Sequence, residues 1–199
     1  MARYACRWAG LWLIATHNGT PDGLERVDVN EYPSVKRHLD SFGDKLTKRT
    51  DMGDTPYNLR GCAYWQDFKK PKVIFPNMTK FMPFVYDNQG YVTNQKCFII
   101  TGKSEAFLTA FFNSSLFKYC FRNAFPMLQD GTRELSKIFF DEIPAFQIPS
   151  SEERQFQEAV KDIQHEYAKE KALRIDAMIF DLYRLSAEER AAIGYIEIE

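Results

Sequence analysis

A turn-rich stretch from Lys48 to Phe75 places the strongest constraint on how this chain of 199 residues folds. Gly53 and Pro56 punctuate its first half and predict a loop with defined turns, whereas Pro71 to Phe75 is predicted to be a strand. Lysines and arginines alternate here with large aromatic rings. This mixture suits nucleic acid, because the cations pair with phosphates while the rings stack on bases. Three aspartates dilute the charge, so a solvated loop that covers the core remains an open interpretation.

The order of residues in this stretch is as specific as its composition. It runs R-x-D-x-G-D-T-P-Y-N-L-R-x-C-A-Y and then F-x-K-P-K-V-I. This pattern resembles the TaqI-like C-terminal specificity domain, the target-recognition domain of adenine-specific DNA methyltransferases and of fused type II restriction-modification enzymes. The resemblance takes in W-A-G-L-W-L-I-A-T-H-N-G upstream and both F-F-N-S-S-L-F and I-D-A-M-I-F-D-L-Y-R-L-S-A-E-E downstream, so it covers nearly the whole chain.

The resemblance implies a domain that recognises double-stranded DNA and leaves the chemistry to an N-terminal methyltransferase domain. The catalytic half of such enzymes carries an (N/D)-P-P-(Y/F) tetrapeptide and a cofactor-binding glycine loop, and neither occurs in this sequence. We therefore expect no catalytic residue and no cofactor in this chain, with S-adenosylmethionine bound by a catalytic domain outside it. The ring-rich start of the chain, up to Thr16, also fits a domain excised from a longer protein.

Hydrophobic residues make up 45% of the chain, which is enough for one core. The expected fold class is α+β, with a twisted, largely antiparallel sheet flanked by helices. The net charge of −1 is unevenly distributed: residues 1–149 carry 19 Lys and Arg against 15 Asp and Glu, whereas residues 150–199 carry 7 against 12. We predict a DNA target-recognition body at 1–149 and an acidic helical tail at 150–199. The tail is expected to pack on the body or on the catalytic domain.

The four cysteines are widely separated, form no C-x-x-C pair and have no histidine nearby in the sequence. Neither a zinc site nor a disulfide scaffold is therefore expected, and we predict no bound metal. The longest apolar run, Ala9 to Ala15, is too short to span a bilayer. We expect a cytoplasmic protein without a membrane partner.

Hydrophobic spacing predicts the main elements. Val35, Leu39, Phe42 and Leu46 recur at helical spacing and predict one buried stripe. A second helix is expected from Ser104 to about Phe121, where the polar run at 113–115 indicates either close packing or a helix break. The other expected elements are strands at 72–75, 84–86, 91–93, 96–101, 138–140 and 146–148, and tail helices with capping boxes at Ser150 with Glu153 and at Ser186 with Glu189.

Two further loops carry chemistry that suits DNA. In the loop at 77–82, the Asn77 amide matches an adenine edge and the Lys80 ammonium matches guanine or phosphate. The turn at 130–133 is expected to present Arg133. An ordinary hairpin loop is the alternative at the first site. The full set of candidate DNA contacts is Lys48, Arg49, Tyr57, Arg60, Lys69, Lys70, Asn77, Lys80, Arg133 and Lys137.

Two other functions remain open. A protein-interaction or specificity subunit without independent DNA binding would show the same aromatic excess and acidic tail. A metal-dependent nuclease would have to use Asp51, Asp54, Asp67 or the adjacent Asp141 and Glu142 as its carboxylates. Turn formation explains the first two aspartates more simply.

Overall fold

The computed structural model describes residues 1–197, which form two compact units. The larger unit comprises Met1–Trp8 and the chain from Lys69 onward, and the smaller unit, Ala9–Phe68, is inserted between these two parts. The predicted boundary between residues 149 and 150 falls inside the larger unit. As a division between a DNA-recognition body and a tail, it stays a prediction. Among residues 1–197, no helix has the length and apolar character that crossing a membrane requires.

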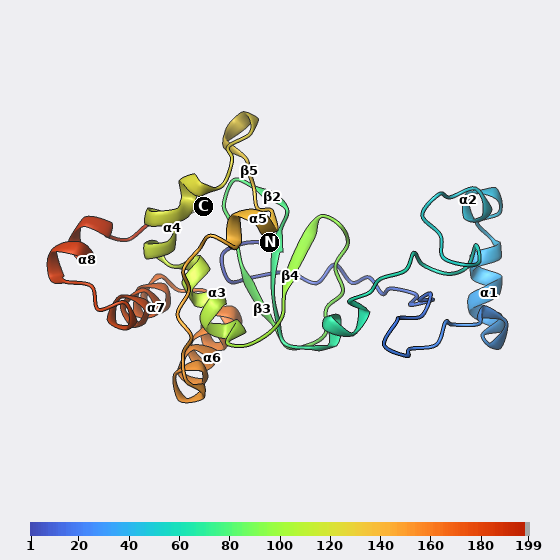
Figure 1. Ribbon diagram of the computed structural model, residues 1–199, viewed down its shortest axis with the longest axis horizontal. Coiled ribbons are helices and arrows are strands. Elements are labelled where there is room, and N and C mark those ends of the chain that lie inside the picture. Colours follow the sequence, from blue (N-terminus) through green and yellow to red (C-terminus); the bar gives the residue numbers. More distant parts are fainter. Residues whose placement is uncertain (198–199) are drawn as a thin grey trace. The chain divides into compact units, whose positions relative to one another are not determined.

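A three-stranded antiparallel sheet of order β3-β1-β4 organises the larger unit (Figure 1). Its central strand β1 (Lys72–Pro76) pairs with β3 (Val85–Asp87) on one side and with β4 (Cys97–Ile100) on the other. The side chains at 73–75 are valine, isoleucine and phenylalanine, all buried, as expected for a central strand of β-branched and aromatic residues. The α+β class predicted from the sequence is confirmed.

A buried ion pair joins the first two of these strands. Lys72 and Asp87 lie directly opposite each other in the β1–β3 register, and Lys72 Nζ is 2.5 Å from the Asp87 carboxylate. Both side chains are almost fully inaccessible. The same carboxylate accepts hydrogen bonds from the backbone N–H groups of Gln89 and Tyr91. These bonds turn the chain after β3, so the strand expected at 91–93 is wrong.

Helices α3 (Glu105–Asn113), α4 (Ser115–Phe121), α6 (Ser150–His165) and α7 (Lys169–Leu182) contribute to the core of the larger unit. Their phenylalanine rings meet mostly at steep angles: Phe111 packs edge-on against Phe117, and Phe107 packs edge-on against Phe156. Such aromatic pairs add to the area that they bury. The C-terminal helices α6 and α7 therefore pack on the body, beside α3 (Figure 1).

The polar run at 113–115 breaks the second helix, which is one of the two outcomes that the sequence left open. Ser114 is extended, and its hydroxyl accepts a hydrogen bond from Phe117 N–H, so it caps α4. The Asn113 amide donates to Phe84 O at 2.7 Å and accepts from Phe84 N–H at 3.2 Å. The side chain thereby pairs with backbone just before β3 as a neighbouring strand would.

The first residues of the chain are held against this break. Arg3 donates to Asn113 O at 2.7 Å and lies 4.0 Å from the Asp176 carboxylate. Asp176 in turn accepts hydrogen bonds from both the backbone N–H and the hydroxyl of Ser115. Burial raises the pKa of Asp176, while the bonds from Ser115 and the charge of Arg3 oppose that rise. Residues from both ends of the sequence thus meet at one buried polar junction.

Two strands expected near the end of the body are wrong. Residues 137–140 form a helical turn, α5 (Lys137–Phe140), and residues 146–148 have no regular structure. The ring of Phe140 packs against Phe75 and Phe125 at centroid distances of 5.0 Å each. This aromatic packing, rather than strand pairing, decides the conformation of the segment.

One of the two expected capping boxes is wrong. Helix α6 begins at Ser150 without a side-chain cap, and Glu153 accepts hydrogen bonds from Ala106 N–H and Phe107 N–H instead. Glu153 therefore caps α3, whose own N-cap, Ser104, makes no side-chain cap hydrogen bond. Burial raises the pKa of Glu153, and the two backbone bonds oppose the rise. The capping box at Ser186 and Glu189 is confirmed, at the start of α8 (Ala187–Ile193).

The smaller unit contains short helices joined by irregular chain. They are a 3-10 turn (Val29–Glu31), α1 (Pro33–Asp40), α2 (Asp44–Thr47) and a 3-10 segment (Trp65–Lys69) that continues into the larger unit. The expected buried stripe is only partly right, because Leu46 is buried but Phe42 is 49% exposed. Gly43, at φ +53°, interrupts the helix between α1 and α2 and so breaks the helical spacing.

Replacing Lys72 with methionine is expected to lower the free energy of unfolding by about 3–5 kcal/mol, because Asp87 would keep a buried charge without its cation. Urea denaturation would measure the change. Lys103→Met, at an exposed lysine of the same unit, is the matched control. A loss for Lys72→Met no larger than that of the control would contradict the structural role of the pair.

The buried Lys118 is expected to make the free energy of unfolding depend on pH. It is buried, its Nζ donates to Met82 O at 2.6 Å, and burial, aided by the charges of Arg3 and Arg122, lowers its pKa well below the usual value. Between that lowered pKa and about 10.4, the unfolded chain binds a proton that the folded chain does not, so stability rises with pH across this window.

The Lys118→Met variant should lose this contribution. The free energy of unfolding of the unchanged protein, measured against that of the variant, is expected to increase as the pH rises from neutral towards 10. Tyrosines and cysteines that also titrate in this range are common to both proteins and cancel in the difference. Parallel stability curves for the two proteins would show that Lys118 keeps an ordinary pKa.

Candidate nucleic-acid interface

A small ribbon in the larger unit joins the two loops that the sequence singled out separately. Strand β2 (Met78–Thr79) pairs antiparallel with β5 (Arg133–Glu134), with Thr79 opposite Arg133. Next to this pairing, Asn77 N–H donates to Lys96 O at 2.9 Å, and Leu135 N–H donates to Asn77 O at 2.7 Å. The backbone of Asn77 is therefore held between two other segments of the chain.

The outer side of this ribbon is a hairpin. Glu134 N–H donates to Pro126 O, and Leu128 N–H donates to Thr132 O at 2.7 Å. Asp130 and Gly131 both have positive φ at its tip. Figure 1 shows this segment projecting beyond β2 and β5. We name residues 77–81, 94–97 and 126–137 together the β2–β5 surface.

The β2–β5 surface combines cations with exposed apolar side chains. Lys80, Lys96 and Lys137 are exposed, and Lys137 Nζ lies 2.6 Å from Asp141 in a solvated ion pair. Such a pair contributes little to stability, so a phosphate can replace the aspartate at small cost. Exposed apolar side chains accompany these lysines, among them Phe81 at 48% and Met127 at 66% exposure. Ammonium groups beside rings and thioethers suit a phosphate backbone with accessible bases.

Arg133 does not project from its turn, so that expectation is wrong. The side chain is buried, with Nη1 donating to Phe125 O at 2.8 Å and Nη2 donating to Asn123 Oδ1 at 3.2 Å. Burial, aided by the charge of Arg122, lowers the pKa of Arg133. The guanidinium holds the chain at 123–125 against β5, because those carbonyl and amide oxygens would otherwise lack a donor.

Lys69 and Lys70 are exposed but lie at the other end of β1 from Asn77. The strand separates them from the β2–β5 surface, so the structure brings together Asn77, Lys80 and Lys137 but not this lysine pair. Lys96 is the residue of the surface that the sequence analysis missed. Its chemistry was visible in the sequence, but only the backbone bond to Asn77 reveals its position.

The smaller unit carries the remaining candidates, and two of them are engaged within it. Arg49 donates from Nη2 to Pro56 O and Asn58 O. The Tyr57 hydroxyl donates to Asp40 Oδ1 at 2.7 Å and accepts from Lys36 Nζ at 3.2 Å. The hydrogen bonds from Lys36 and Tyr57 lower the pKa of Asp40. These contacts hold the turn in place.

The other two candidates in the smaller unit are more accessible. Lys48 forms an exposed ion pair with Asp44 at 2.6 Å, and Arg60 is exposed. An exposed pair of this kind leaves Lys48 available to an anion. Both residues therefore stay candidate DNA contacts.

Asn58 is the buried centre of the T-P-Y-N-L-R segment, and the sequence analysis did not single it out. Its Nδ2 donates to Val27 O at 2.9 Å and to His17 O at 3.3 Å, while its Oδ1 accepts from Thr55 Oγ1 and Arg26 Nη1. One amide thus links segments at 16–17, 26–27 and 55–58 of the smaller unit.

Gly53 belongs to the same turn. A Cβ atom at this position would lie 2.6 Å from Leu59 O and would overlap the Asn18 amide. That amide pairs with Asp54, donating from Nδ2 to its carboxylate and accepting from its backbone N–H. Close backbone packing therefore requires glycine at position 53. Within residues 1–197, no cluster of three or more His, Cys, Asp and Glu side chains is placed to hold a metal ion.

Residues 25–145 match the family model of the TaqI-like C-terminal specificity domain, and because this match covers more than half of the chain, the chain belongs to that family. The specificity domain is the non-catalytic, DNA-recognising part of restriction-modification proteins. The matched range contains both the T-P-Y-N-L-R segment and the β2–β5 surface.

Replacing Asn58 with alanine should destabilise the smaller unit by about 2–4 kcal/mol, because Val27 O loses its donor and the Thr55 hydroxyl and Arg26 lose their acceptor. Amide hydrogen exchange would report this change residue by residue. Protection is expected to fall within residues 9–68 and to stay unchanged in β1. Asn30→Ala, at an exposed asparagine of the same unit, is the matched control. Equal protection in the two variants would remove Asn58 from its central role.

Proposed function

We propose that this chain is the DNA sequence-recognition domain of a site-specific adenine DNA methyltransferase or of a fused restriction-modification enzyme. It positions duplex DNA for methylation by a catalytic domain outside this sequence, which supplies S-adenosylmethionine and the adenine pocket. The complete protein acts in the cytoplasm on double-stranded DNA. The observation that carries the proposal is family membership together with the pairing of two DNA-suited loops into one surface.

Different residues of the β2–β5 surface bind the phosphates and contact the base edges. Lys80, Lys96 and Lys137 bind phosphates and fix the position of the domain on the duplex. The hairpin at 126–132 and the amide of Asn77 approach base edges, where hydrogen-bond donors and acceptors differ between base pairs. Arg133 acts behind this surface as a support for the hairpin.

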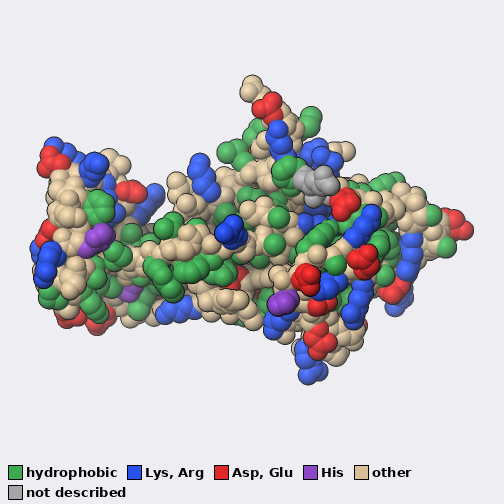
Figure 2. Space-filling model, turned by 180° about the vertical axis from the view of Figure 1, so that it is seen from behind, with side chains coloured by type: hydrophobic (Ala, Val, Ile, Leu, Met, Phe, Trp, Pro, Cys, Tyr) green, Lys and Arg blue, Asp and Glu red, His purple; other side chains and the backbone are tan. Residues whose placement is uncertain are grey.

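The distribution of charge supports the part of the larger unit that precedes residue 150 as the main DNA-binding part. Its residues 1–8 and 69–149 hold 12 Lys and Arg against 6 Asp and Glu, whereas residues 9–68 hold 7 against 9. Figure 2 shows acidic and basic side chains interspersed on the helical part of the larger unit, on the right in that view. The slightly acidic smaller unit favours a second candidate function for that part, contact with the catalytic domain rather than with DNA.

Lys80→Ala and Lys137→Ala are each expected to weaken duplex binding similarly for all sequences and to reduce the salt slope of the affinity by about 1. Binding would be measured by fluorescence anisotropy over a range of salt concentrations. Lys103→Ala removes an equal charge from an exposed position outside the surface and is the matched control.

Salt slopes that fall equally in all three variants would place DNA binding elsewhere. A second measurement tests sequence recognition in the complete methyltransferase. Exchanging residues 77–81 and 126–134 for those of a relative with a different target should change the methylated site. An unchanged methylated site would contradict the assignment of base reading to these loops.

A further inference from the structure

The hairpin between Pro126 and Glu134 exposes apolar side chains on the β2–β5 surface. Met127 is 66% exposed and Leu128 is 43% exposed. Exposed apolar side chains that are grouped on one surface often mark an interaction site, because burying them against a partner removes their apolar area from water. The phosphate contacts proposed for the lysines of this surface do not account for these two side chains.

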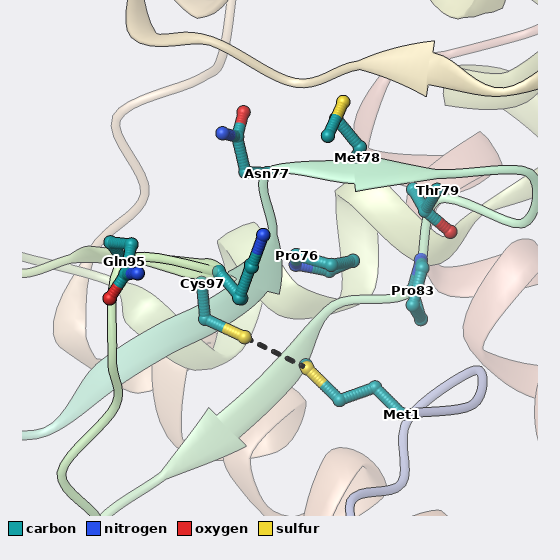
Figure 3. Close-up of a pocket in the computed structure, with 9 residues that line it drawn as sticks. Met1, Pro76, Asn77, Met78, Thr79, Pro83, Gln95 and Cys97 are labelled. Carbon is teal, nitrogen blue, oxygen red and sulfur yellow. Dashed lines mark hydrogen bonds between the residues drawn. The ribbon is translucent and has the colours of Figure 1, made fainter.

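The pairing of the hairpin determines the direction of both side chains. Met127 pairs with Arg133, which in turn pairs with Thr79. Directly paired residues share one face of a ribbon, whereas successive residues of a strand point to opposite faces. Figure 3 shows this alternation in β2, where Met78 and Thr79 extend to opposite sides of the strand. Met127 therefore lies on the face of Thr79 and Arg133, and Leu128 lies on the opposite face.

The hairpin is supported from within and accompanied by cations. The buried Arg133 donates to Phe125 O at 2.8 Å, which holds the base of the hairpin in place. The exposed Lys80 follows the strand that pairs with the hairpin, and the exposed Lys137 follows the hairpin itself. The major groove of DNA admits a two-stranded ribbon, and phosphates line both of its sides. A projecting ribbon with lysines beside it therefore matches the major groove in both shape and charge.

The chemistry of the two exposed side chains restricts what they can recognise in that groove. Neither Met127 nor Leu128 carries a hydrogen-bond donor, and the methionine thioether is only a weak acceptor. Most groups on the base edges are hydrogen-bond donors or acceptors, but thymine also presents a C5-methyl group, which is apolar. Burying one such methyl group against an apolar side chain is expected to raise the affinity about fourfold.

We propose that the hairpin enters the major groove, where Met127 and Leu128 each bury the C5-methyl group of one thymine. The DNA site of this chain therefore contains thymine at the two positions that these side chains reach. Because the side chains lie on opposite faces of the hairpin, the two methyl groups lie on opposite sides of it. The inference rests on the proposed function, since duplex DNA must occupy this surface, and it adds the class of base that the hairpin reads.

The first experiment removes methyl groups from the DNA. Duplexes that bind this chain would be selected from a random pool. Each thymine of an enriched duplex would then be replaced, one at a time, by deoxyuridine, which lacks only the C5-methyl group. We expect the affinity to fall about fourfold at two positions and to stay unchanged at the others. Fluorescence anisotropy at one fixed salt concentration would measure the affinity, because binding to DNA depends on salt.

The second experiment assigns these positions to side chains. Met127→Ala and Leu128→Ala should each bind the unmodified duplex about fourfold more weakly and lose the distinction between thymine and deoxyuridine at one position. Each variant should bind the duplex with deoxyuridine at that position as tightly as the unchanged chain does. Leu173→Ala, at an exposed leucine of α7, is the matched control and should keep both distinctions. Lys80→Ala should weaken all duplexes equally and keep them as well.

The outcomes separate this inference from the proposed function. Duplex binding that no deoxyuridine substitution weakens, or an enriched site without thymine, would overturn the methyl contacts while the recognition function stands. A distinction between thymine and deoxyuridine that persists in both alanine variants would assign the methyl groups to other residues and also overturn the inference. Absence of duplex binding at low salt would overturn the proposed function together with the inference.

Discussion

The buried polar junction at Asn113–Ser115 is the constraint on which the larger unit depends. Asn113 bonds to the backbone before β3 and accepts from Arg3, while Ser115 bonds to Asp176 on α7 and accepts from Ile196 N–H. The sheet, both helices of the broken pair and both ends of the sequence therefore meet in one hydrogen-bonded cluster. Because an unpaired buried polar group costs free energy, these hydrogen bonds favour this arrangement of the elements.

The sequence was sufficient for the α+β class, the central strand and the amphipathic helices, because these follow from local spacing. Prediction from the sequence failed where contacts with residues distant in the chain determine the local structure. Glu153 has the spacing of a local cap but caps α3 instead. The sequence around Phe140 predicts a strand, but its ring packs against Phe75 of β1 and against Phe125, and the segment is helical. The break at Ser114 was visible as an anomaly, but only the contacts of Asn113 explain it.

The sequence predicted which residue types the candidate site contains, but not which of these residues lie together. Asn77 and Lys80 were found as polar loop residues. The residues between them, Met78 and Thr79, pair with Glu134 and Arg133, more than fifty residues later in the chain, and local sequence does not show this register. Arg133 shows the limit of residue type as evidence, since an arginine in a turn can face inward when carbonyls there need donors. Asn58 shows the opposite case, because a short amide gave no sign of its central position.

The hydrogen bonds of Arg3 have a consequence for folding during synthesis of the protein. Its guanidinium bonds to Tyr195, which lies 192 residues later in the chain. During synthesis, this bond therefore forms only after residue 195 has been made, whereas the contacts within residues 9–68 join residues closer together in the sequence. Contacts between residues so far apart in the sequence slow folding, because the entropy of closing a long loop is lost before they form.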